Sequence, residues 1–146
     1  MSELSAPNDL SIERSTDLDL DVDELWTLVS TAEGWSSWLV DDANITIAPD
    51  ATGTATNDGV ERSVRIESVT AGRGIGLVWW DRDDPSTASY VQLEIVELPG
   101  GRSHLDITER LLGTTPMASK SCSLASRWDV ALISLWLLAL PSLVMA

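Results

Sequence analysis

Two residues of this chain have side chains that often carry catalysis: the only histidine, His104, and the only cysteine, Cys122. Nucleophilic catalysis needs a nucleophile beside an oriented base, and a zinc site needs several histidine, cysteine or carboxylate ligands. His104 falls in the outward phase of an expected strand, with no second histidine to support it. Cys122 is expected to be an inert small residue on a helix. The sequence therefore predicts no catalytic residue, no metal site and no cofactor.

Two further motifs are similar to ligand-binding loops but lack the rest of the pattern. The segment 72–76, GRGIG, precedes a strand, whereas a nucleotide-binding loop joins a strand to a helix. Asp81, Asp83 and Asp84 are acidic enough for calcium, but their spacing does not complete a calcium-binding loop. We interpret the first motif as a turn and the second as the solvated tip of a hairpin.

The chain has seven tryptophans and no phenylalanine. Indoles give a large apolar contact area and one hydrogen-bond donor each, so several of them could line a cavity for a flat or lipid-like molecule. The alternative is that the indoles pack in the core and fill the cavity themselves. Both interpretations remain open from the sequence. The residues predicted to bind a hydrophobic ligand in this way are Trp35, Trp38, Trp79, Leu105, Trp128 and Leu132.

The elements expected to position these side chains are a series of strands followed by one long helix. Asp21 and Glu24 have the spacing of a capping box and predict a helix, which the segment from Thr31 to Gly34 breaks. A short helical turn over 35–39 then brings two indoles to one side and forms a lid. Asn-Asp-Gly at 57–59 is a strong turn signal. Alternating apolar residues predict strands over 10–20, 44–49, 60–69, 75–80, 89–98 and 102–111.

The expected C-terminal helix has two different faces. A threonine and proline at 114–116 supply the N-cap and first turn, and Pro141 ends the helix after about Leu140. One face is expected to pack on the sheet, and it carries Leu124, Trp128, Ala131, Leu132, Leu135 and Ala139. The opposite face begins polar and becomes apolar at Val130, Ile133 and Leu137, which we predict to be an interface.

Composition limits the partners and the location. The formal charge of −14, from 23 acidic and 9 basic residues, argues against binding nucleic acid or anionic membrane surfaces. Residues 130–146 are uncharged but shorter than the ~20 residues that span a membrane. One cysteine and a polar N-terminus predict a cytoplasmic protein. We expect a flexible arm over residues 1–9 and a single domain over 10–146.

The order of these elements predicts an α+β protein with an antiparallel sheet and helices on one side. The chain resembles the SRPBCC (START and Bet v 1-like, helix-grip) superfamily, and within it bacterial proteins similar to the C-terminal domain of the activator of the ninety-kilodalton heat-shock-protein ATPase. The segments that carry the resemblance are Ile12-Glu13-Arg14, Leu25-Trp26, Trp35 to Trp38, Val64-Arg65-Ile66, Leu77-Val78-Trp79, Leu105 to Glu109, and Trp128.

The resemblance implies a curved antiparallel sheet wrapped around a long C-terminal helix, with two short helices after the first strand. It also implies a deep cavity between sheet and helix, and neighbouring first and last strands. Arg14 and Glu109 both fall in the inward phase of those strands, so we predict that they meet as the polar end of the cavity. The alternative is that both lie near strand ends in water.

Three functions follow from the resemblance. The first is a non-enzymatic module that binds a small hydrophobic molecule, with the lid over 35–39 controlling access. The second is a protein-interaction domain that forms a homodimer or binds a chaperone-like partner through the apolar face of the helix. An enzyme resembling the polyketide cyclases ranks last, because no inward histidine or aspartate constellation supports it.

Overall fold

The structure is a computed structural model that describes residues 11–112 and 118–139, and side chains of the last helix from 128 to 138. The expected arm over 1–9 and both predicted ends of the C-terminal helix lie outside these residues. The elements are β1 (Ser11–Leu18), α1 (Val22–Val29), α2 (Ala32–Trp38), β2 (Asp42–Asn44), β3 (Thr52–Asn57), β4 (Val60–Thr70), β5 (Gly74–Asp81), β6 (Asp84–Leu98), β7 (Arg102–Leu111) and α3 (Ala118–Ala139).

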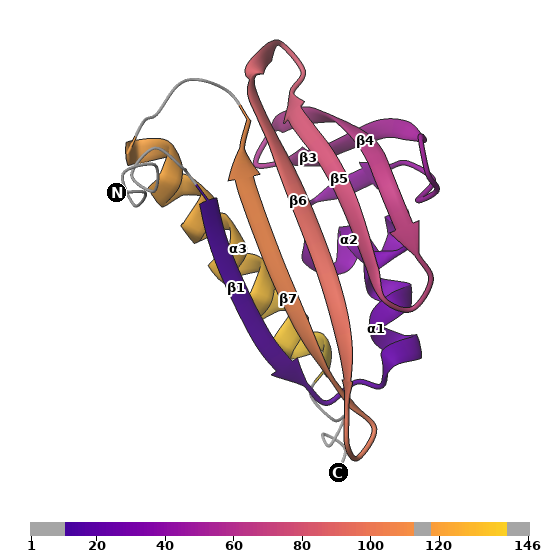
Figure 1. Cartoon of the computed structure of the whole chain (residues 1–146). Coiled ribbons are helices and arrows are strands. Elements are labelled where there is room, and N and C mark those ends of the chain that lie inside the picture. Colours follow the sequence, from indigo (N-terminus) through magenta and orange to yellow (C-terminus); the bar gives the residue numbers. More distant parts are fainter. Residues whose placement is uncertain (1–10, 113–117, 140–146) are drawn as a thin grey trace, which may run out of the picture.

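Seven strands form one antiparallel sheet in the order β1-β7-β6-β5-β4-β3-β2. All three helices lie on the same face of this sheet (Figure 1). Helix α1 packs on β6 and β7, α2 packs against α1 and α3, and α3 packs on β1. The predicted α+β helix-grip architecture is therefore confirmed, including the pairing of the first strand with the last.

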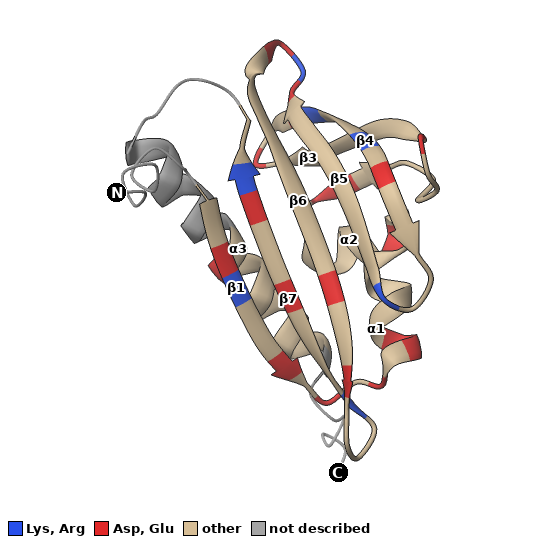
Figure 2. Cartoon of the chain, viewed as in Figure 1, with Lys and Arg blue, Asp and Glu red and all other residues tan. Residues whose placement is uncertain are grey.

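The alternation of β7 shows how the sequence builds the two faces of the sheet. Leu105 and Ile107 face the helices and are buried, whereas His104 and Asp106 face outward, as the period-two pattern predicts. Acidic residues recur along β1, β6 and β7 (Figure 2). One face of the sheet thus supplies the core, and the other faces solvent.

Helix α1 begins as predicted. The backbone N–H of Glu24 donates to Asp21 Oδ1 at 2.8 Å, and the backbone N–H of Asp21 donates to Glu24 Oε1 at 3.0 Å. Leu25 and Val29 are buried against the core. This capping box fixes the direction in which the chain leaves β1 and crosses the sheet.

The predicted break over 31–34 is confirmed only in part, because α1 ends at Val29 but α2 already begins at Ala32 and contains Gly34. Thr31 caps this helix through a bond from the backbone N–H of Gly34 to Thr31 Oγ1. A Cβ atom at Gly34 would lie 2.5 Å from the carbonyl oxygen of Leu28 and 2.6 Å from that of Thr27. The close approach of α1 and α2 requires glycine at position 34, whereas the backbone conformation there does not.

The predicted strand over 44–49 is wrong. The structure has a short strand, β2, that ends at Asn44, and a second strand, β3, whose sequence TGTATN contains little apolar alternation. The turn over 57–59 is confirmed: Asp58 and Gly59 have φ angles of 53° and 77° and join β3 to β4. The predicted hairpin tip at Asp81, Asp83 and Asp84 joins β5 to β6, and it is tight, because β6 begins at Asp84 and pairs there with Asp81.

Candidate functional site

A buried carboxylate lies between the sheet and α3. Glu109 of β7 is completely buried. Trp79 Nε1 of β5 donates to Glu109 Oε2 at 2.9 Å, and Trp128 Nε1 of α3 donates to Glu109 Oε1 at 2.7 Å. The hydroxyl of Ser89 on β6 donates a short hydrogen bond to Oε2. Hydrogen bonds to a charged acceptor are strong in a water-free interior. Glu109 therefore links strands β5, β6 and β7 to helix α3.

The four tryptophans predicted to line a cavity pack against one another. Trp79 and Trp128 stack with ring centroids 6.3 Å apart, and Trp35 meets Trp79 edge to face at 6.4 Å. Trp38 lies 6.5 Å from Trp128. The indole N–H groups of Trp35 and Trp38 donate to the carbonyl oxygens of Val29 and Leu28 at 2.8 and 2.9 Å, respectively. Together with buried Leu105 and half-buried Leu132, these rings occupy much of the space between sheet and helix.

The predicted meeting of Arg14 with Glu109 is wrong. Glu109 faces inward as expected, and its cross-strand neighbour on β1 is Ile12. Arg14 lies one inward position further along β1, where its Nε donates to Asp129 Oδ1 of α3 at 2.9 Å. Both partners of this ion pair are partly solvent-exposed. Arg14 therefore contacts α3 at the surface and does not enter the core.

A groove of about 760 Å³ lies beside the indole cluster. It runs between the end of α2 and its following loop on one side and α3 on the other, and the β3–β4 turn closes one end. Of the residues predicted to bind a ligand, Trp38 lines this groove, and Val130 from the predicted interface does so as well. Its other apolar lining residues are Leu39, Val40, Val60 and Ala131.

Arg62 lines the same groove and was missed by the sequence analysis. Its Nε donates to Asp81 Oδ1 at 3.3 Å, and its guanidinium carbon lies 5.1 Å from the centroid of the Trp79 ring. Only 14% of the side chain is exposed. The signal was present in the sequence, because Arg62 shares the inward phase of Val64 and Ile66 in β4.

The predicted interface residues of α3 are strongly exposed. Val130, Ile133 and Leu137 have exposed fractions of 62–64%, and Trp136 is also exposed beside them. Apolar surface of this kind on one helix face is typical of a contact surface. The structure therefore leaves this strip available to a partner.

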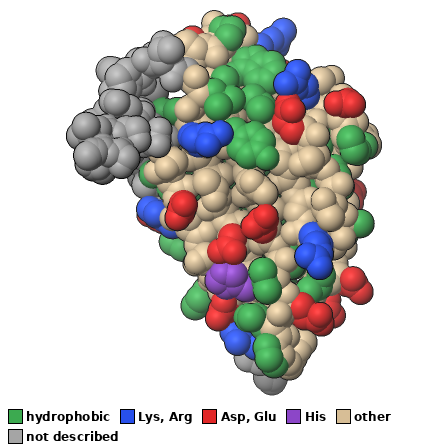
Figure 3. Space-filling view, viewed as in Figure 1, with side chains coloured by type: hydrophobic (Ala, Val, Ile, Leu, Met, Phe, Trp, Pro, Cys, Tyr) green, Lys and Arg blue, Asp and Glu red, His purple; other side chains and the backbone are tan. Residues whose placement is uncertain are grey.

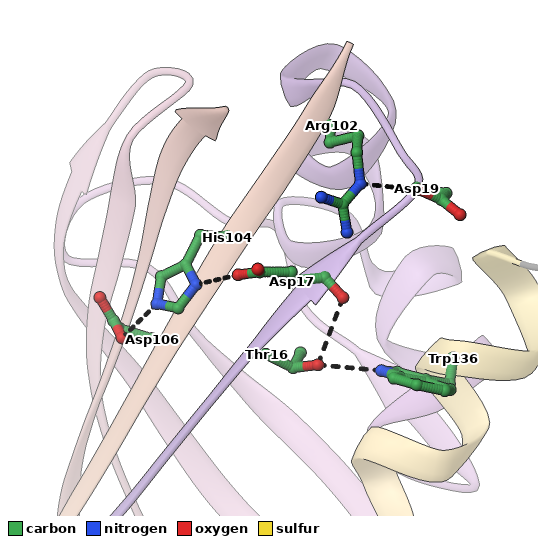
Figure 4. Close-up of polar contacts among 7 residues, drawn as sticks. All are labelled: Thr16, Asp17, Asp19, Arg102, His104, Asp106 and Trp136. Atoms are coloured by element: carbon green, nitrogen blue, oxygen red, sulfur yellow. Dashed lines mark hydrogen bonds and ion pairs between the residues drawn. The ribbon is translucent and has the colours of Figure 1, made fainter. Parts of the chain in front are cut away.

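His104 lies on the opposite, outer face of the sheet. Its Nδ1 is 2.5 Å from Asp17 Oδ1 on β1, and its Nε2 is 3.0 Å from Asp106 Oδ1 on the same strand (Figure 4). Acidic side chains surround the imidazole in the lower half of this face (Figure 3). Among the described residues, no group of three histidine, cysteine or acidic side chains is arranged to hold a metal ion.

These contacts make the stability of the fold depend on His104. The hydrogen bond to Asp17 raises the pKa of His104 above its ordinary value of 6.5, and Asp106 adds to this while partial burial opposes it. Because the folded-state pKa is raised, the stabilisation is complete below about pH 6.5 and is lost as the pH rises through the folded-state pKa. We expect the unfolding free energy to decline over that range in the unaltered protein, and His104→Gln to remove this part of the decline.

Urea unfolding of both proteins at a series of pH values measures this difference. The difference between the two curves is the relevant quantity, because other groups that titrate in the same range contribute equally to both. A constant difference from about pH 6 to pH 9 would show that the imidazole is not held as a cation by Asp17 and Asp106.

No protein-family model and no curated protein sequence matches the chain. Solved structures show the fold. CalU16 from Micromonospora echinospora is 19% identical, with a TM-score of 0.72 over 92% of this chain and 79% of that one. Protein MLL2253 from Mesorhizobium loti is 16% identical, with a TM-score of 0.76 over 88% and 95%. The Aha1 dimer from Colwellia psychrerythraea is 12% identical, with a TM-score of 0.69 over 86% and 92%.

These likenesses show the helix-grip fold, and identities this low carry no function. None of the helices in the described parts of the chain has the length and apolar character needed to cross a bilayer.

Proposed function

We propose that this protein is a non-enzymatic binding module that holds a small hydrophobic molecule beside its C-terminal helix. The observation that carries the proposal is the groove of about 760 Å³ between α2 and α3. Pockets for small molecules commonly have ~300–1,000 Å³ and combine apolar walls with a few polar groups. This groove combines apolar lining residues, among them Trp38, Val40 and Ala131, with polar ones that include three serines.

The packed indoles give the proposal a definite shape. The sequence predicts a ligand between the sheet and α3, but Trp35, Trp79 and Trp128 pack against one another there. We therefore place the ligand at the flank of this cluster, with Trp38 as the shared wall. Trp79 and Trp128 support that wall from behind through their bonds to Glu109.

The charged side chains of the groove favour binding over catalysis. The described residues that line it include Asp41, Asp58 and Arg62, and no histidine or cysteine is among them. Asp41 accepts the backbone N–H of Asp58 at 2.9 Å and so holds the β3–β4 turn. This set supplies charge and hydrogen bonds beside the apolar side chains of the groove. For that reason an enzyme similar to the polyketide cyclases remains the last alternative.

The neutral fluorescent probe N-phenyl-1-naphthylamine tests the proposal. It should bind the protein saturably, because it is apolar and carries no charge that the acidic surface would repel. Ser134 lines the groove from α3, so Ser134→Trp should fill the groove and weaken binding by about tenfold or more, since a bulky ring excludes the probe from its site. Ser134→Ala, which leaves the groove open, should bind as the unaltered protein does.

Fluorescence titration gives the three dissociation constants, and unfolding curves confirm that the variants fold. A lack of saturable binding, or equal binding by Ser134→Trp, would contradict a binding site in this groove.

A second function is favoured by the exposed strip at Val130, Ile133 and Leu137. One structural neighbour was solved as a dimer, and the strip offers an apolar surface through which two copies, or one copy and a chaperone-like protein, could associate. Native mass spectrometry separates the two functions. A monomer carrying a co-purified small molecule supports the groove, whereas a ligand-free dimer supports the strip.

A further inference from the structure

The chemistry of Arg62 narrows the class of ligand. Its contacts with described residues are the Nε bond to Asp81 and the approach to the Trp79 ring. Neither terminal Nη group donates to a protein acceptor among these residues. No buried side-chain nitrogen or oxygen in the described parts of the chain lacks a partner. The Nη groups are therefore accessible, and the groove that Arg62 lines is where a ligand can reach them.

An accessible guanidinium group beside apolar side chains of the same groove is a donor for a ligand oxygen. Arg62 is oriented in advance, because its Nε donates to Asp81 and its guanidinium carbon lies over the Trp79 ring. A donor fixed in advance loses little conformational entropy when it binds an acceptor. The ligand is thus expected to carry an oxygen acceptor next to its apolar body.

The charges around the groove distinguish a neutral acceptor from an anionic one. Arg62 is paired with Asp81, and Asp41 and Asp58 add two negative charges to the lining. The chain as a whole has a formal charge of −14. An anionic ligand would gain one attraction to Arg62 and meet repulsion from the other groups, whereas a carbonyl oxygen gains the hydrogen bond without the repulsion.

From these observations we infer that the groove binds an uncharged, ring-containing molecule whose carbonyl oxygen accepts a hydrogen bond from the Nη groups of Arg62. The apolar rings of the ligand lie against Trp38, Val40 and Ala131. This inference rests on the proposed binding function and adds the chemical class of the ligand and the residue that selects it.

Three probes with the same ring skeleton test the inference by competition with N-phenyl-1-naphthylamine. 9-Fluorenone carries the carbonyl group, fluorene lacks it, and 9-fluorenone-4-carboxylate adds a negative charge. We expect 9-fluorenone to bind about tenfold more tightly than fluorene, as a hydrogen bond from a charged donor predicts. The carboxylate should bind more weakly than 9-fluorenone, by about threefold or more. This difference in affinity should shrink at high salt, because salt screens the repulsion.

Two variants of β4 assign the effect to Arg62. Arg62→Met keeps the aliphatic stem but removes the donors, so 9-fluorenone and fluorene should bind this variant with equal affinity. Arg65→Met is the matched control, because Arg65 lies on the same strand but is exposed and bound to Glu67. It should alter neither affinity. Unfolding curves show whether the loss of the bond to Asp81 affects folding.

The outcomes separate this inference from the proposed function. If the naphthylamine probe binds in the groove but 9-fluorenone and fluorene bind equally, or if Arg62→Met keeps the preference for the carbonyl, the ligand class is wrong and the binding module stands. Tighter binding of the carboxylate would likewise overturn the choice of a neutral ligand. If no probe binds saturably, the proposed function fails as well.

Discussion

Replacing Glu109 by glutamine should lower the free energy of unfolding by about 2–4 kcal/mol. The two carboxylate oxygens accept bonds from Trp79, Trp128 and Ser89 in a place without solvent. Glutamine has nearly the same shape, but one of the two oxygens becomes an NH₂ group that points a donor at a donor. A buried indole N–H then loses its acceptor, and the remaining bonds lose the negative charge that strengthens them. Chemical denaturation followed by tryptophan fluorescence measures the change.

Glu97 provides the matched control. It lies on neighbouring strand β6 and is exposed, so Glu97→Gln should change the free energy of unfolding by less than about 0.5 kcal/mol. A Glu109→Gln protein as stable as the unaltered one would mean that the indoles do not depend on the carboxylate. The proposed support of the groove wall would then have to be abandoned.

Replacing Trp128 by alanine should cost about 3–5 kcal/mol, the range found when large aromatic side chains are removed from a core. Trp128 is completely buried, stacks on Trp79 and donates to Glu109. Its loss removes the largest side chain through which the described part of α3 contacts the core. Heat or urea unfolding should show the loss of stability, and the groove probe should bind more weakly because one wall of its site loses its support.

Trp136 is the control for Trp128. It is the same residue type on the same helix, but 54% of it is exposed, and its indole N–H donates only to the hydroxyl of Thr16 at 2.9 Å. Trp136→Ala should therefore cost about 1 kcal/mol or less. Equal costs for the two variants would show that α3 is not held to the sheet through the Trp128 side.

The sequence allowed the fold to be predicted because most elements state their own periodicity. The alternation in β7 and the capping box at Asp21 each fix local geometry through nearest neighbours. Strand β3 and the interior position of Gly34 could not be predicted in this way. The sequence of β3 is nearly uniform in size and polarity, and a helical glycine has the same local signal whether it ends a helix or lets another helix approach.

The site was predicted in part, for a related reason. Phase shows which face of a strand a residue occupies, and it correctly placed Glu109 inside. Phase does not show which residue of a distant helix lies opposite. Arg14 therefore pairs with Asp129 of α3, which could not be positioned on β1 from sequence alone. Arg62 has the inward phase, but phase alone does not mark it as a lining residue, because the long side chain of an arginine can reach solvent from an inward position.

The close approach at Gly34 has a mechanical consequence. The backbones of α1 and α2 touch where a side chain would otherwise separate them, and Trp35 and Trp38 are tied to carbonyl groups at the end of α1. A displacement of α2 away from the sheet must carry α1 with it and uncover Leu25 and Val29. The two short helices thus form one rigid unit. Entry of the proposed ligand is therefore expected to require movement of α3 or of the β3–β4 hairpin.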